Sequence, residues 1–180
     1  MVYVFLADGF EEIEALGTVD ILRRCDISVQ TVSITDNLTV KGTHGISVTA
    51  DILFENIREE DAEALVLPGG LPGADNLEDC KELTTLLKTK AGEGAILAAI
   101  CAAPKILGLL GLLSGVKATC YPGFEAKLIG ARVKHKDVVS DGNFVTAKGA
   151  GVTQNFAQAI AEKLGKGAAC RRVIKNMYYK

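Results

Sequence analysis

Largely apolar runs alternate with amphipathic segments along the whole chain. Three of these runs are apolar on both faces, which is typical of strands buried inside a parallel sheet. They lie at Val2–Ala7, Ala64–Leu67 and Ala95–Ile100. Between them, apolar residues recur with helical spacing, as in Glu11–Arg24, where five apolar positions can form one buried face.

The remaining segments continue this alternation. The pattern predicts further strands at Ile27–Ile34, Lys117–Cys120, Lys136–Val139 and Phe144–Ala147, a hairpin of Thr39–Lys41 with Ile46–Thr49, and helices at Leu83–Lys90, Pro104–Leu113, Thr153–Leu164 and Ala168–Met177. Such alternation favours an α/β fold with a doubly wound, mostly parallel sheet and helices on both faces. Folds of this kind place their functional sites at the carboxyl ends of the strands.

Composition narrows the class of protein. The chain has 180 residues, 48% hydrophobic, and a net charge of −2, which predicts one domain over residues 1–180 and argues against nucleic-acid or membrane-surface binding. No apolar run approaches membrane-spanning length, and the opening segment lacks the features of a signal peptide. The five cysteines are widely spaced, so neither a disulfide framework nor a metal site is indicated. No cofactor is expected, and a cytoplasmic protein fits this use of cysteine.

Cys101 is the main candidate for chemistry. It follows the buried run Ala95–Ile100 directly and precedes Ala102, Ala103 and Pro104. Because proline favours the first position of a helix, Cys101 is expected on a sharp strand-to-helix turn that resembles a nucleophile elbow. A helix N-terminus lowers the pKa of a thiol, so we expect a reactive thiolate here. The alternative is an ordinary buried cysteine that acts as a small hydrophobe.

Two other segments also follow core strands. Glu11, Glu12 and Glu14 fall in the first turn of the first predicted helix, where acidic residues commonly just complement the helix dipole. One of them could instead face inward beside Cys101 and act as a general acid or base, while the others stay solvated. In Pro68-Gly69-Gly70, glycine amides could form an oxyanion hole together with the amide that follows Cys101.

Several motifs in the same order resemble the ThiJ/PfpI superfamily, and within it the branch that contains the parkinsonism-associated protein deglycase. They are Leu6–Glu14, Val19–Arg24, Val66–Gly70 with Gly73–Leu77, and Ala98–Pro104, with a weaker match at Thr146–Gly151. The resemblance implies a flavodoxin-like fold, usually homodimeric. It also implies an oxidation-sensitive nucleophile at Cys101, a protonated Glu14 beside it, and an oxyanion site of the Gly70 and Ala102 amides.

Two positions depart from that pattern. Tyr121 stands where the deglycase branch often has a histidine, so a Cys–His pair is not expected at this position. The Tyr121 hydroxyl is instead a candidate for orienting the substrate. His44 stands where the human member has an arginine near the dimer interface. His44 and His135, the two histidines of the chain, are both expected at the surface.

Three functions remain open. The first is a cysteine-dependent glyoxalase or deglycase-like enzyme that acts on reactive carbonyls of the methylglyoxal type or on their glycated adducts. The second is an oxidative-stress sensor or chaperone that works through oxidation of Cys101. The third is an intracellular cysteine peptidase or amidase, for which the missing histidine is unfavourable.

Overall fold

The computed structural model describes residues 1–178, so the last two residues of the predicted domain lie outside the described part. Its centre is a seven-stranded sheet in the order β10-β11-β7-β6-β1-β2-β5. All neighbours in it are parallel except β10 and β11. The strands are β1 (Val2–Leu6), β2 (Val29–Ser33), β5 (Ile52–Leu53), β6 (Ala64–Leu67), β7 (Ile96–Ile100), β10 (Val138–Asp141) and β11 (Phe144–Ala147).

Two small sheets lie outside the central one. β3 (Thr39–Lys41) and β4 (Ser47–Thr49) form the predicted hairpin, and β8 (Lys117–Ala118) pairs in parallel with β9 (Arg132–Val133). Four short 3-10 helices complete the loops: η1 (Phe54–Asn56), η2 (Glu59–Asp61), η3 (Glu125–Lys127) and η4 (Ala150–Val152).

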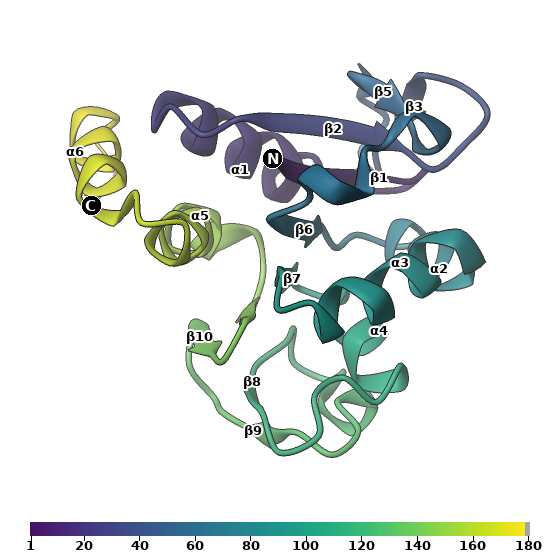
Figure 1. Cartoon of the computed structure of the whole chain (residues 1–180), viewed down its shortest axis with the longest axis vertical. Helices are drawn as coiled ribbons and strands as arrows, with labels where there is room; N and C mark the ends of the chain where they lie inside the picture. Colours follow the sequence, from purple (N-terminus) through teal and green to yellow (C-terminus); the bar gives the residue numbers. More distant parts are fainter. Residues whose placement is uncertain (179–180) are drawn as a thin grey trace.

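Helices cover both faces of the sheet, as Figure 1 shows. One layer contains α1 (Glu12–Arg24), α5 (Thr153–Lys163) and α6 (Gly167–Asn176); the other contains α2 (Gly73–Asp79), α3 (Lys81–Gly92) and α4 (Pro104–Leu109). The expected doubly wound, flavodoxin-like architecture is therefore confirmed. Among the residues described, each helix is too short or too polar to cross a membrane.

Two hydrophobic cores result from the alternation of side chains along the strands. In β1, Val2, Val4 and Leu6 pack beneath α1 and α5, while Tyr3 and Phe5 face the α3 and α4 side. All five are buried, which explains why the strand is apolar on both faces.

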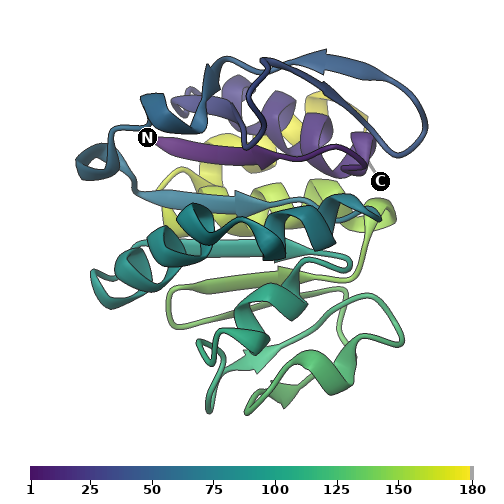
Figure 2. The same ribbon diagram turned by 90° about the vertical axis from the view of Figure 1, so that its right-hand side faces the viewer.

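The winding of the sheet reverses between β1 and β6. From β1 the chain moves outward through β2 and β5, and it then returns to the other side of β1 with β6, β7 and β11. Figure 2 shows β1 running away from the N-terminus, so that its carboxyl end lies on the opposite side of the molecule. The crevice beside such a reversal is where doubly wound folds bind ligands.

Several predicted elements differ from those observed. The helix after Cys101 ends at Leu109 rather than Leu113, and the strand predicted over Lys117–Cys120 ends at Ala118, outside the central sheet. After that strand, the Thr119 amide bonds to the Thr146 hydroxyl, and the Tyr121 amide bonds to the Cys101 carbonyl. These amides are therefore not available to extend a strand ladder.

Candidate functional site

Cys101 lies on the turn between β7 and α4, and α4 begins at Pro104 as predicted. Its backbone has a φ of 64°, a left-handed conformation that residues other than glycine rarely adopt. The Cys101 amide donates to the Ala147 carbonyl of β11 at 2.9 Å, which ties the turn to the neighbouring strand. The side chain is partly buried and its thiol is free.

Glu14 reaches this turn from the first turn of α1. Its side chain is 1% exposed, and its Oε2 accepts a hydrogen bond from the Gly69 amide at 2.8 Å. The carboxyl group also lies beside the Cys101 thiol, close enough for each group to shift the pKa of the other. Its second oxygen, Oε1, is buried and has no hydrogen-bond partner among the described residues. The structure thus brings together the two residues that the sequence put forward for chemistry.

The Pro68-Gly69-Gly70 turn packs directly against both groups. A Cβ added at Gly69 would lie 2.6 Å from the Cys101 Cβ and 2.7 Å from Glu14 Oε2, so this position has no room for a side chain. The amides of Gly70 and Ala102 both lie close enough to the Cys101 sulfur to lower its pKa. The sequence suggested this motif as a source of amides for an oxyanion hole, but it did not predict that the Gly69 amide donates to Glu14.

Burial raises the pKa of Glu14 to about 7, although the Gly69 amide and the Cys101 thiol act to lower it. A carboxyl group in this environment holds its proton near neutral pH far more often than an exposed glutamate does.

The expectation of a lowered thiol pKa is contradicted. Burial, followed by the charge and hydrogen bond of Glu14, raises the pKa of Cys101 to about 12, and the Gly70 and Ala102 amides offset only part of this increase. The sequence argument considered the helix N-terminus and not the buried carboxylate. The effect of that charge disappears when Glu14 is protonated, and the protonated carboxyl can donate to a thiolate. The thiolate of Cys101 is therefore favoured only when Glu14 holds the proton.

Tyr121 lies beside the same turn. Its amide donates to the Cys101 carbonyl at 2.8 Å, and its side chain is 51% exposed. The ring borders Gly149, where an added Cβ would lie 3.4 Å from the ring and 3.9 Å from Glu14 Oε1. Tyr121 thus forms an accessible aromatic wall close to the unpaired oxygen of Glu14.

The expectation that Glu12 stays solvated is wrong, because its side chain is buried. Its Oε1 accepts hydrogen bonds from the His44 and Ile46 amides, and its Oε2 lies 2.8 Å from Nδ1 of the exposed His44 ring. Burial acts to raise the pKa of Glu12, but these hydrogen bonds outweigh it and the net shift is downward. The pKa of His44 is raised by its hydrogen bond to Glu12 and by the charge of Glu11.

Glu11, Glu12 and His44 are also a set that could hold a metal ion, because one ligand atom from each lies within 4.8 Å of the others. Both oxygens of Glu12 are already engaged in the hydrogen bonds that hold the turn between β3 and β4. The geometry is therefore accounted for by the attachment of this turn to α1.

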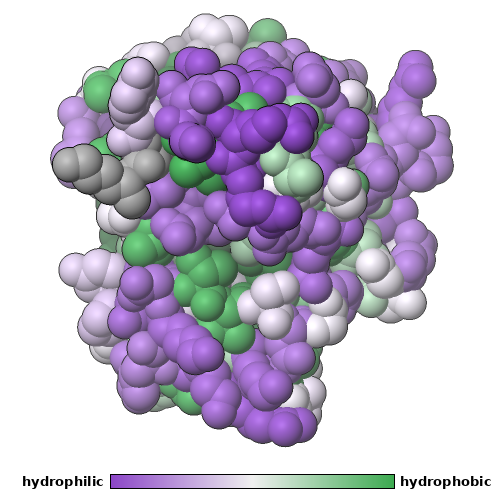
Figure 3. Space-filling model, turned by 90° about the vertical axis from the view of Figure 1, so that its left-hand side faces the viewer, coloured by the Kyte–Doolittle hydropathy of each residue, from purple (hydrophilic) through white to green (hydrophobic). Residues whose placement is uncertain are grey.

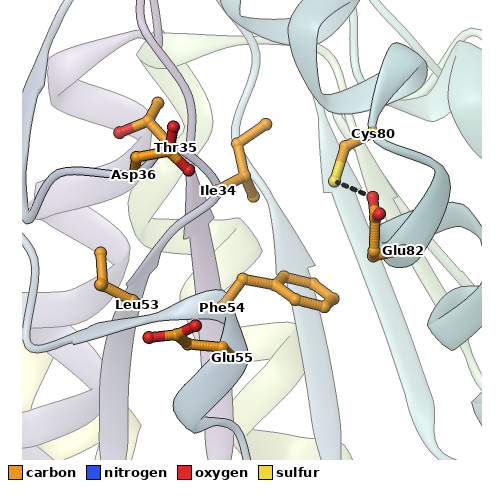
Figure 4. A pocket seen from close by; sticks show the side chains of 8 residues that line it. All are labelled: Ile34, Thr35, Asp36, Leu53, Phe54, Glu55, Cys80 and Glu82. Carbon is orange, nitrogen blue, oxygen red and sulfur yellow. Dashed lines mark hydrogen bonds between the residues drawn. The ribbon is translucent and has the colours of Figure 1, made fainter.

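Away from Cys101, a pocket of about 460 Å³ lies beside the carboxyl end of β2 (Figure 4). It is lined by Ile34, Thr35, Asp36, Leu53, Phe54, Glu55, Cys80 and Glu82. The Cys80 thiol donates to Glu82 at 3.7 Å. Neither Cys101 nor Glu14 lines this pocket, so it is separate from the candidate site.

The fold and site define a class of protein: a flavodoxin-like α/β protein with a cysteine on a strained strand-to-helix turn and a buried glutamate beside it. Comparison with known families matches residues 1–163 to the DJ-1/PfpI family, and the chain belongs to that family. This confirms the resemblance drawn from the sequence motifs.

Individual relatives agree with this assignment. The chain is 39% identical over 165 residues to Protein DJ-1 homolog B of Arabidopsis thaliana, covering 91% of this chain and 38% of that protein. It is 34% identical over 144 residues to Deglycase PH1704 of Pyrococcus horikoshii, covering 79% and 86% of the two chains. The chain spans about two fifths of the length of the Arabidopsis DJ-1 homologs B and A that it matches.

Among solved structures, oxidized Toxoplasma gondii DJ-1 superposes with a TM-score of 0.93 at 33% identity, covering 99% of this chain and 97% of that one.

Proposed function

We propose that this protein is a cysteine-dependent glyoxalase or deglycase-like enzyme that acts on reactive carbonyls of the methylglyoxal type or on their glycated adducts. The observation that carries the proposal is the contact between the Cys101 thiol and a buried carboxyl group with a pKa near 7. The deglycase name of the Pyrococcus relative supports the substrate class.

In the proposed reaction the Cys101 thiolate adds to the aldehyde carbon of methylglyoxal. The Gly70 and Ala102 amides are placed to stabilise the oxyanion that forms. Glu14 then moves the proton from the aldehyde carbon to the neighbouring carbon, which leaves a thioester of lactate on Cys101. Water hydrolyses this thioester, so that methylglyoxal and one water give lactate and the free thiol. For a glycated adduct, the amine or thiol is released as the leaving group.

Redox sensing through Cys101 is the second candidate. Cys101 is partly exposed, and a relative of very similar fold has been solved in an oxidized form. A Cys–His peptidase is not supported, because the groups that shift the pKa of the Cys101 thiol are Glu14 and backbone amides, while the His44 ring is bonded to Glu12.

The direct test is lactate formation from methylglyoxal by the full-length protein. We expect Cys101→Ser to abolish turnover, and Glu14→Gln to reduce it by roughly 10²-fold or more because the amide cannot transfer a proton. Asp20→Asn is the matched control, since Asp20 is an exposed acid on the same helix.

Activity that survives in Cys101→Ser would overturn the enzymatic proposal. An inactive wild type whose Cys101 gains oxygen atoms in mild peroxide would favour redox sensing instead, and mass spectrometry of the Cys101 peptide measures that gain.

A further inference from the structure

Two buried thiols from opposite ends of the chain meet on the α1 side of the sheet. Cys25 follows α1 directly, and Cys170 lies in α6. They are 2% and 0% exposed, belong to the same hydrophobic core, and Cys25 lies close enough to Cys170 to raise the pKa of its thiol.

The placement of Cys170 follows from the amphipathic pattern of α6. Cys170, Val173, Ile174 and Met177 recur with helical spacing and pack on the core that α1 and α5 share. Arg171 lies on the solvent side of the helix. Figure 3 views the molecule from the side on which α6 lies and shows a mostly hydrophilic surface. Packing of the apolar stripe therefore buries Cys170 in the core to which α1 and Cys25 also contribute.

Cys25 is held firmly at its position. Its amide donates to the Ile21 and Leu22 carbonyls, and Asp26 next to it turns the chain with a φ of 54°. The thiol that Cys170 meets therefore belongs to a backbone fixed by the end of α1.

The other three cysteines have different surroundings. The Cys101 thiol contacts Glu14, the Cys80 thiol donates to Glu82, and Cys120 lies near Glu125. Of the five cysteines, Cys25 and Cys170 are the two that are buried in the core on the α1 side of the sheet, and Cys25 is one of the neighbours that raise the pKa of Cys170.

We propose that Cys25 and Cys170 are a redox-active pair that oxidises to an intramolecular disulfide and fastens α6 to α1. With hydrogen peroxide as the oxidant, one thiol becomes a sulfenic acid and releases water. The second thiol then attacks that sulfur, forms the S–S bond and releases a second water. Two thiols and one peroxide thus give one disulfide and two waters.

Burial sets the order of events. The pKa of Cys170 is raised to about 12 by burial and by the neighbouring Cys25, so the Cys170 thiol is protonated and unreactive in the closed protein. Oxidant reaches it when α6 opens, because α6 packs mainly on α1 and α5 and not on the strands of the sheet. Cys101 therefore oxidises first and the pair second, and closure of the disulfide prevents further opening of α6.

The test uses the full-length protein in two arms. In the first, folded protein is treated with peroxide or with diamide; in the second, it is refolded from guanidinium in a glutathione redox buffer, where access is not limiting. Tryptic digestion without reduction should yield residues 25–41 joined to residues 167–171. The midpoint of thermal unfolding should rise by several degrees on oxidation and return with dithiothreitol, because the cross-link constrains the unfolded chain.

Cys25→Ala and Cys170→Ala should each abolish the joined peptide and the thermal shift, while the matched control Cys80→Ala should keep both. Alanine is chosen because it keeps both positions apolar. The proposal is overturned if both thiols remain free in both arms, or if they pair with other cysteines.

Discussion

Folding changes the ionisation of Glu14 in the range between pH 4.5 and 7, and this change makes the stability depend on pH. Its pKa rises from 4.5 to about 7, so the folded state holds more protons than the unfolded state between these values. The free energy of unfolding therefore falls as the pH rises through this window, by about 3 kcal/mol in total. Below pH 4.5 both states are protonated and the penalty is absent.

Chemical denaturation of wild type and Glu14→Gln between pH 4 and 8 measures this effect. Glutamine does not titrate, so the wild type should lose stability relative to the variant as the pH rises from 4.5 to 7. A pH-independent difference would show that folding leaves the pKa of Glu14 unchanged. Asp20→Asn, at an exposed position, should follow the wild-type profile.

At the scale of elements, the first turn of α1 holds the turn between β3 and β4 through one buried side chain. Glu12 accepts the His44 and Ile46 amides and the His44 ring. Replacing it with alanine leaves these donors without their acceptor, at a cost of about 1–3 kcal/mol.

Hydrogen exchange measures the consequence of Glu12→Ala directly. Exchange of the amides at His44 and Ile46 should accelerate strongly, whereas amides of the central strand β6 should change only as far as global stability changes. Unchanged protection at His44 would contradict the assigned role of Glu12. Asp20→Ala removes an acid from the same helix and serves as control.

At the scale of the whole molecule, the homodimer implied by the family resemblance remains a prediction. The exposed side chains Ile13 and Ile46 flank Glu12, at 60% and 56% exposure, and could supply an apolar contact between two copies. Light scattering should give twice the mass of one chain for the wild type, and Ile13→Lys should shift the mass toward that of one chain. A wild-type mass of one chain would contradict the prediction.

Much of this architecture could be predicted from local patterns. Runs that are apolar on both faces identified β1, β6 and β7, and the rule that sites follow strand ends identified Cys101 and the Pro68-Gly69-Gly70 turn. The short helix α2 was missed, because Leu71-Pro72-Gly73 resembles a turn and the helix buries little beyond Ala74 and Leu77.

The contacts that the sequence did not predict come from residues distant along the chain. Glu12 and Glu14 look alike in sequence, but the β3–β4 turn covers one and Gly69 contacts the other. Lys105 is similar: its side chain is 2% exposed because Asp75 and Glu78 of α2 pair with it. Neither acid is its neighbour in sequence. Burial of this kind is decided by tertiary contacts, which local periodicity does not encode.

Because the backbone of Cys101 is left-handed, the residue that would be most stable at this position is not the residue that supplies the reactive thiol. That conformation costs an L-residue about 1–2 kcal/mol, a cost that glycine avoids. A mutant library screened only for heat resistance would therefore favour glycine at position 101 and discard the thiol. More thermostable variants of this protein therefore require substitutions at other positions, where greater rigidity does not remove the nucleophile.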